Sequence, residues 1–260
     1  MTAGAGAPDA PGASALAPTA WRYGSATRTA TYGFLAALPL FLFYEVGILL
    51  TSAGGGIRVG ADVWLKSLLG SLGLQGWAAL GGVVLLLGAV VVWAERRRRP
   101  PFRAGWFGGI VLESLVYAVV LAFAVGSVVG LLFNGWVLPT AMMQASDGFP
   151  LSLKLALSIG AGLYEELVFR MILVGGLFVL LHRLLPSRKG AYVVAALIGA
   201  IVFSAVHYVG PYGDPFALPS FTFRFLFGLA LNAVFLLRGF AVAAWTHALY
   251  DVLVVTGSFG

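Results

Sequence analysis

Two adjacent glutamates, Glu165 and Glu166, lie near the centre of an apolar run over residues 151–181 that is long enough to cross a lipid bilayer. An ionised side chain at the centre of a membrane helix costs roughly 2.5–3.5 kcal/mol on insertion scales. Two neighbouring carboxylates at this depth therefore need partners or a function, and Arg170 in the same run is the first candidate partner. This constrains the fold, because polar groups from other helices are expected to meet the helix that carries the two acids.

The composition indicates a membrane protein independently of that run. Hydrophobic residues make up 60% of the chain, charged residues 10%, and the mean hydropathy is +0.95. A soluble domain of this length would be far more polar. The chain has no cysteine, which excludes disulfides and thiol nucleophiles. The net charge of +6 could suggest nucleic acid, but the cations lie in short segments between apolar runs, so we expect a lipid bilayer and no nucleic acid as the partner.

The apolar runs predict an all-α, polytopic membrane helix bundle of seven or eight transmembrane helices. The seven predicted spans cover approximately residues 30–51, 76–94, 106–133, 151–181, 190–209, 221–237 and 239–256.

The chain as a whole is expected to divide into three parts. Residues 1–20 are rich in Ala, Gly and Pro and predict a disordered tail. Residues 21–140 are expected to hold N-terminal transmembrane helices, and residues 141–260 a second helix bundle that carries the polar motifs described below. The stretch 57–74 alternates apolar and charged residues, so it predicts an interfacial or re-entrant helix, or an eighth span if it crosses the bilayer.

Basic residues between the spans predict the orientation of an integral membrane protein in a bacterial inner membrane. In the seven-span arrangement eleven of them fall on one side and four on the other, so the first side and the N-terminus are expected in the cytoplasm. The eleven are Arg22, Arg28, Arg96, Arg97, Arg98, Arg99, Arg103, Arg183, Arg188, Lys189 and Arg238.

The spacing within the acidic run separates the two glutamates. On a helix Glu166 and Arg170 are four residues apart on one face, in the favourable order for an ion pair. Glu165 points about 100° away from Glu166, since a helix has 3.6 residues per turn. One carboxylate can therefore be structural while the other is available for chemistry. The alternative is that both acids only neutralise the arginine.

Two further polar pairs interrupt later spans. Phe203 and His207 lie at the outer end of the fifth span, where a lone histidine could also be only an interfacial residue. His247 and Asp251 lie four apart on one face of the last span, where Asp251 could fix the imidazole tautomer, or the pair could simply hold helices together.

The motifs EELVFR, FSAVH and HALYD, in this order on successive membrane helices, resemble those of the CPBP family of intramembrane endopeptidases, which includes CAAX prenyl proteases and bacteriocin-processing relatives. The resemblance covers about residues 151–257. It implies a glutamate-dependent endopeptidase that cleaves a membrane-associated protein or peptide, with or without a lipid group, near its terminus.

The resemblance also implies roles for the residues of the motifs. Glu165 would activate water with the help of His207, and His247 with the last motif residue would stabilise the oxyanion. Glu166 and Arg170 would hold the helix, with Phe203 in a supporting place. The last residue here is Asp251 where the family also allows Asn, and an ionised aspartate cannot donate a hydrogen bond to an oxyanion. Supporting contacts are also expected from Asn232, which could bond within the site but more simply bridges two helices.

Alternatives remain open at the level of the sequence. No cofactor is expected, but Glu165, His207, His247 and Asp251 would also suit zinc with an open position for water. A proton-coupled transporter or a non-catalytic immunity protein could use the same polar groups.

The seven-span arrangement places His207 and Asp251 in the outer half of the bilayer, so the site is expected to open to the external face. Glu45 and Glu113 lie nearer span ends, where hydration or an interfacial partner is expected. Five glycines are expected to allow close helix approach around the polar cluster: Gly160, Gly162, Gly175, Gly176 and Gly228.

Overall fold

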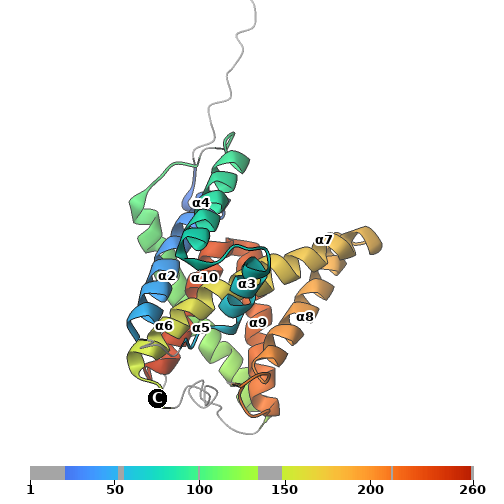
Figure 1. The fold of residues 1–260 in the computed structure, drawn as a ribbon. Coiled ribbons are helices and arrows are strands. Elements are labelled where there is room, and N and C mark those ends of the chain that lie inside the picture. The colour runs from blue at the N-terminus through green and yellow to red at the C-terminus, as the bar shows by residue number, and fades with distance from the viewer. Residues whose placement is uncertain (1–20, 52–55, 99, 134–147, 212, 259–260) are drawn as a thin grey trace, which may run out of the picture.

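A computed structural model describes residues 21–51, 56–98, 100–133, 148–211 and 213–258, together with the backbone but not the side chains of residues 77 and 78. Over these residues every regular element is helical, which confirms the predicted fold class (Figure 1). The predicted tail over residues 1–20 lies outside the described ranges. The elements are α1 (Tyr23–Ala26), α2 (Ala30–Thr51), α3 (Gly60–Ser71), α4 (Gly76–Ala94), α5 (Ala104–Leu132), α6 (Leu151–Glu165), η3 (Glu166–Val174), α7 (Gly175–Leu184), α8 (Arg188–Val206), α9 (Leu218–Arg238) and α10 (Phe240–Val255).

Each of the seven predicted spans is a helix in the described part of the chain. Five are long and apolar enough to cross a bilayer, with α6, η3 and α7 forming one continuous span, Leu151–Leu184. The other two, Ala79–Ala94 and Phe240–Val255, are apolar but shorter. The amphipathic stretch 57–74 forms α3, whose 12 residues extend about 18 Å and cannot cross a hydrocarbon core of about 30 Å. The structure therefore does not support an eighth span there.

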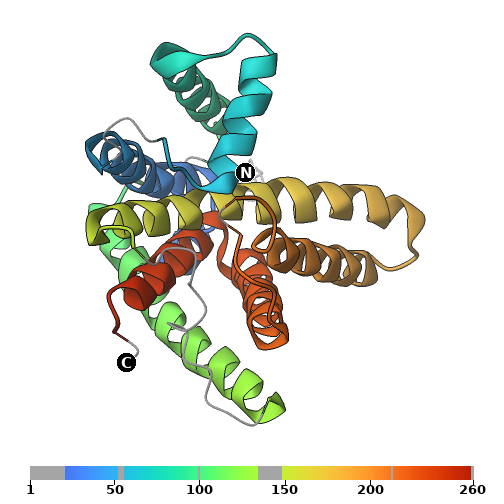
Figure 2. The ribbon, with the colours of Figure 1, turned by 60° about the horizontal axis from the view of Figure 1, so that its bottom comes forward.

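Helix α10 occupies the centre of the bundle and packs against α2, α5, α6 and α9 (Figures 1 and 2). Small alanines on α10, including Ala244 and Ala248, are fully buried and let its neighbours come close. The hydrophobic clusters join α2 with α6 and α10, and α5 with α9 and α10, so the two predicted parts on either side of residue 140 share their cores. Helices α7 and α8 pack on each other and extend together to one side (Figure 2).

Glycines at the helix crossings set how closely the polar helices approach. A Cβ on Gly162 of α6 would lie 2.5 Å from the backbone nitrogen of Ala248 on α10, and one on Gly160 would lie 2.3 Å from the ring of Tyr44 on α2. Gly228 approaches Phe203 of α8 in the same way. The expectation for Gly175 and Gly176 is wrong, since the nearest contact is 3.6 Å at the first and none lies within 4 Å at the second. The sequence analysis missed Gly199, whose Cβ would lie 2.3 Å from Val174.

The segment η3 is a π-helix, which begins directly after Glu165. A π-helix has wider turns than an α-helix and is frequent at functional sites. The 3.6-residue geometry assumed from the sequence therefore holds up to Glu165 but not for the residues that follow. This change of helix type occurs at the position where the two acids must face different partners.

Several contacts bring the N-terminal segment, the end of α4 and the start of α10 to one end of the bundle. Glu95, just after α4, accepts hydrogen bonds from the backbone of Ala30 and Thr31 at 2.9 Å each. Arg238 at the end of α9 pairs with Glu113 of α5 at 2.5 Å and donates to the carbonyl of Gly24. These segments carry most of the basic residues assigned to one side, so the structure places them at a common end.

Candidate active site

Four side chains converge from three separate helices. Glu165 is the last residue of α6, His207 follows the last residue of α8, and His247 and Asp251 lie one turn apart on α10. The Oε2 atom of Glu165 is 3.9 Å from Nε2 of His207 and 4.0 Å from Nε2 of His247. These residues are far apart in the sequence, and the structure brings together all four that were predicted as catalytic.

The carboxylate of Glu165 is the least satisfied group of this cluster. Its Oε2 atom is buried and has no hydrogen-bond partner among the described residues, although 15% of the whole side chain is exposed. A separation of 3.9 Å to an imidazole nitrogen is too long for a direct hydrogen bond but suits a single bridging water. The arrangement can therefore bind water between a carboxylate and an imidazole.

The orientation of His207 follows from its other ring nitrogen. Nδ1 lies 2.7 Å from the carbonyl oxygen of Phe203, and because a carbonyl can only accept, Nδ1 donates this hydrogen bond. In the neutral imidazole Nε2 then carries a lone pair, which faces Glu165. His207 can thus accept a proton, or a hydrogen bond from water, at the atom nearest the free carboxylate oxygen.

His247 is held by Glu166, a contact that the sequence analysis did not predict. Its Nδ1 atom lies 2.7 Å from Oε1 of Glu166, so this nitrogen donates to the carboxylate. Its Nε2 atom faces the other two acids, 3.6 Å from Asp251 and 4.0 Å from Glu165. The sequence analysis considered Asp251 as one possible partner that orients this imidazole, whereas in the structure His247 donates its hydrogen bond to Glu166.

Glu166 also makes the predicted ion pair. Its Oε1 atom is 3.0 Å from a terminal nitrogen of Arg170, although the angles are not those of a hydrogen bond. The guanidinium of Arg170 lies over the ring of Phe203, with Cζ 4.3 Å from the ring centroid. Phe203 in turn packs edge-to-face against both site histidines, with centroids 5.0 Å from His207 and 5.9 Å from His247. One aromatic ring thus packs between the buried cation and both imidazoles.

Asn232 lies away from these groups. Its side-chain amide donates to the backbone carbonyl of Ala196 at 3.2 Å, and the backbone carbonyl of Asn232 accepts from the hydroxyl of Tyr192 at 2.8 Å. Both partners belong to α8, so Asn232 bridges α8 and α9. This is the simpler of the two roles expected from the sequence. Helix–helix hydrogen bonds of this kind are common among buried membrane residues.

The spacing of the four side chains can be compared with the ligand spacing of a zinc site. Tetrahedral zinc with bonds of about 2.0–2.1 Å requires ligand atoms roughly 3.3–3.4 Å apart. The contacts of Glu165 with His207 and His247, and of His247 with Asp251, are 3.6–4.0 Å long, and no group of three or more His, Asp or Glu within the described ranges has the arrangement for a metal ion. The side chains would have to move inward by several tenths of an ångström to bind zinc, and zinc stays an untested alternative to the expected absence of a cofactor.

A second charged cluster, which we call the α3 charge cluster, lies beside the site. It consists of Glu45 on α2 with Arg58, Asp62 and Lys66 on or before α3. Lys66 lies 2.5 Å from Glu45 and 2.8 Å from Asp62. Burial opposes the charge of Arg58, but its hydrogen bond to Asp62 and the charge of Glu45 outweigh that effect and raise the pKa of Arg58. Glu45 is only 3% exposed, so it has the interfacial partners expected from the sequence but little of the hydration.

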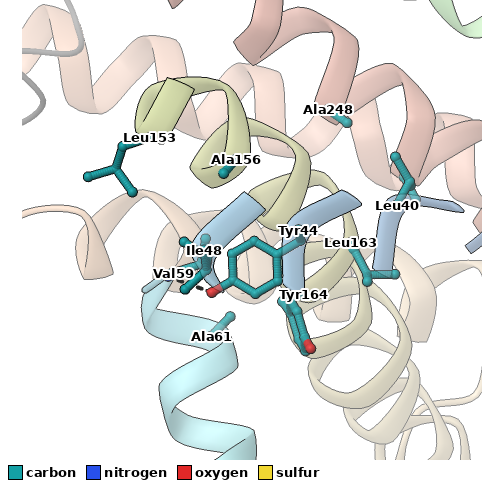
Figure 3. Packing of buried hydrophobic residues seen from close by; sticks show 11 residues of the cluster. Leu40, Tyr44, Ile48, Val59, Ala61, Leu153, Ala156, Leu163, Tyr164 and Ala248 are labelled. Carbon is teal, nitrogen blue, oxygen red and sulfur yellow. Dashed lines mark hydrogen bonds between the residues drawn. The ribbon is translucent and has the colours of Figure 1, made fainter. Parts of the chain in front are cut away.

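The α3 charge cluster contacts the helix that carries the site. Tyr164, directly before Glu165, donates to Glu45 at 3.0 Å, and Tyr44 donates to Asp62 at 2.8 Å. The two tyrosines pack edge-to-face in the core between α2 and α6 (Figure 3). The i,i+4 spacing of the acid and base on α3 was the available sequence signal, but nothing in the sequence indicated that its partner is Glu45.

The comparison with protein families falls on this half of the chain. Residues 147–253 match the model of the Rce1-like family, described as type II CAAX prenyl endopeptidase, and this range contains all three motifs. The family resemblance is confirmed. The match supports an intramembrane CAAX-type endopeptidase, an integral membrane protein whose substrates are membrane-associated peptides or proteins. No curated protein and no solved structure matches the chain.

Proposed function

We propose that the chain is a glutamate-dependent intramembrane endopeptidase that hydrolyses a peptide bond near the terminus of a membrane-associated protein or peptide, and that a prenylated CAAX peptide is the first substrate to test. The observation that carries this proposal is the buried, unpartnered Oε2 of Glu165, which lies 3.9 and 4.0 Å from two imidazoles. The family match supports the substrate class, because its members are described as CAAX prenyl endopeptidases. The geometry supplies a base, a second polar group for water and a donor within one cluster.

In the proposed reaction a water binds between Glu165 and Nε2 of His207. Glu165 removes one proton from this water while the oxygen of the water attacks the scissile carbonyl, which gives a tetrahedral intermediate and a protonated glutamate. The intermediate then collapses with cleavage of the C–N bond, and the proton on Glu165 passes to the leaving amine. The carboxylate is regenerated, and one water has been consumed for one peptide bond.

The oxyanion of the intermediate needs a donor on the opposite side of the carbonyl. His247 in its imidazolium form can supply one from Nε2, because Nδ1 already donates to Glu166. Asp251 lies 3.6 Å from Nε2 and would hold this imidazole toward the site rather than contact the oxyanion itself. This division of roles removes the need for an amide at position 251.

The variant Glu165→Gln tests the proposal. It keeps the size and hydrogen-bonding capacity of the side chain but removes its basicity, so cleavage of a prenylated, internally quenched CAAX peptide in proteoliposomes should fall by about 100-fold or more. Glu113→Gln, which changes a glutamate at the other end of the bundle, serves as the matched control and should keep activity. If Glu165→Gln cleaves the peptide at the wild-type rate, the proposed role of Glu165 is wrong.

A substrate other than a prenylated protein can be found with the same variant. Membrane proteins and peptides from cells with the wild type are compared with those from cells with Glu165→Gln, since a substrate gains a shorter form only in the first. A shortened protein without a prenyl group would replace the prenylated peptide as the substrate while leaving the reaction unchanged.

We also propose that the N-terminus lies in the cytoplasm and that the site opens to the external face. His207 at the end of α8 and Pro211 lie at the same end of the bundle, opposite the α7–α8 turn at Pro186. Because the chain has no cysteine, Pro211→Cys and Pro186→Cys each introduce a single reactive thiol. A membrane-impermeant maleimide added to intact cells should label only the first, and labelling of only the second would reverse the orientation.

A further inference from the structure

His207 lies where α8 ends and the chain turns toward α9, so its position depends on what holds this turn. The backbone N–H of Asp214 donates to the carbonyl of His207 at 2.9 Å. On the helix side, Nδ1 of the ring is already held by the carbonyl of Phe203. His207 is thus held through its ring from one direction and through its backbone from the other.

Asp214 is itself held by Arg224, on the second turn of α9. The two side chains form an ion pair in which each is about nine-tenths buried. Arg224 also donates to the hydroxyl of Ser220 at 2.9 Å, and the same hydroxyl accepts from Tyr208 at 2.8 Å. The guanidinium lies 5.1 Å from the centroid of the Tyr208 ring. Arg224 therefore contacts both Asp214 and Tyr208, the two residues that flank the turn after His207.

The two site histidines are held in related ways. Arg170 pairs with Glu166, which holds His247, and Arg224 pairs with Asp214, which holds His207. Each site histidine is thus contacted by an acidic residue that pairs with an arginine, through the carboxylate of Glu166 for His247 and through the backbone N–H of Asp214 for His207.

We propose that Arg224 is a positioning residue for His207, acting through Asp214. This inference rests on the proposed function, because it assigns a task to the imidazole that binds water beside Glu165. The pair keeps the turn after α8 closed and so keeps Nε2 of His207 facing the carboxylate. Arg224 does not touch the substrate, and its removal displaces His207 without changing the chemistry of Glu165.

Arg224→Gln is the first test, with the quenched prenylated peptide as the probe. A misplacement of about 1 Å in a catalytic group can cost up to about 100-fold, so kcat should fall about 10- to 100-fold while KM stays within a factor of about three. Arg238→Gln is the matched control. Arg238 lies on the same helix as Arg224, at its opposite end, and is also paired with an acid, Glu113. Its kcat should stay within roughly twofold of the wild type.

A double-mutant cycle separates positioning of His207 from a merely structural role. If Arg224 acts through His207, Arg224→Gln should change kcat by less than about twofold in a His207→Ala background. An equal loss in both backgrounds overturns the proposal. The charge-exchanged double variant, D214R with R224D, should recover most of the lost kcat because it restores the pair, and Arg224→Lys should be intermediate because a lysine makes a single contact.

These outcomes are distinct from those of the proposed function. Thermal midpoints in detergent are measured for every variant, and a charge-exchanged protein that is as stable as the wild type but no faster than Arg224→Gln contradicts the positioning role. Wild-type kcat in Arg224→Gln does the same. If Glu165→Gln is inactive while all Arg224 variants are fully active, only the present inference fails, whereas an active Glu165→Gln removes the proposed function itself.

Discussion

The crossing of α6 and α10 at Gly162 offers a direct test of how the site is assembled. A Cβ at this position would lie 2.4 Å from Cβ and 2.5 Å from the backbone nitrogen of Ala248, and 2.6 Å from the carbonyl oxygen of Ala244. Two of these atoms are backbone and cannot rotate away. To reach an ordinary contact of 3.4 Å from 2.5 Å, the helices must separate by about 0.9 Å in Gly162→Ala.

This separation can be converted into a loss of stability. Overpacking of this kind costs about 1–3 kcal/mol. Glu166 lies one turn after Gly162, so its 2.7 Å bond to His247 would lengthen to about 3.6 Å and its net contribution, about 1.5–3 kcal/mol, would be lost. Alanine in place of glycine in a helix returns about 1 kcal/mol. The expected net destabilisation of Gly162→Ala is therefore about 2–5 kcal/mol.

Gly176→Ala is the matched control, because a Cβ there meets nothing within 4 Å. It should leave stability unchanged or raise it by about 0.5–1 kcal/mol. The assay is the thermal midpoint in detergent micelles, followed by kcat for the quenched prenylated peptide in proteoliposomes. At roughly 2–4 °C per kcal/mol, Gly162→Ala should melt about 4–20 °C below the wild type. The reasoning is refuted if Gly162→Ala has the same thermal midpoint and the same kcat as the wild type.

Three further predictions concern the buried charges and the metal. Glu166→Gln should lower the free energy of unfolding by about 3–5 kcal/mol, because it leaves Arg170 as an unpaired buried charge, and should also lower kcat because Glu166 holds His247. The double variant Glu166→Gln with Arg170→Met should recover the stability but not kcat. If the double variant is no more stable than Glu166→Gln, the loss of the ion pair is not the cause of the destabilisation. Tyr164→Phe should cost about 1 kcal/mol through the lost hydrogen bond to Glu45, measured by thermal unfolding, with an unchanged midpoint contradicting it. Purified active protein treated with a zinc chelator should keep its activity and hold no stoichiometric zinc by elemental analysis, whereas parallel loss of zinc and activity would establish the metal alternative.

Much of the fold was accessible from the sequence because membrane insertion imposes a simple rule. Every spanning segment must be a long apolar helix, so hydropathy located the seven predicted apolar helices, five of which are long enough to cross a bilayer, but left α3 open as a possible eighth span. The i,i+4 spacing also predicted the Glu166–Arg170 ion pair within one helix, and the pair forms although this segment is a π-helix and not the α-helix assumed. Local periodicity is sufficient where both partners belong to the same element.

Contacts between helices were less predictable, for a physical reason. The bond from His247 to Glu166 depends on how α6 and α10 cross, and this crossing is set by glycines and alanines that have no polar signal of their own. Gly199 was missed and Gly176 wrongly included for the same reason, because the sequence does not state which face of a helix meets a neighbour. The π-helix η3 rotates the residues after Glu165 away from the positions that a 3.6-residue period predicts.

The place of Asp251 illustrates how these contacts change a chemical interpretation. From the sequence, an aspartate at the last motif position conflicts with a role as donor to an oxyanion, because an ionised carboxylate only accepts. In the structure Glu166 holds Nδ1 of His247, and Asp251 lies 3.6 Å from Nε2 of the same ring. The carboxylate therefore faces an imidazole nitrogen that can donate. An acid at this position is compatible with the proposed oxyanion stabilisation, because in that proposal the donor is the histidine between Asp251 and Glu166.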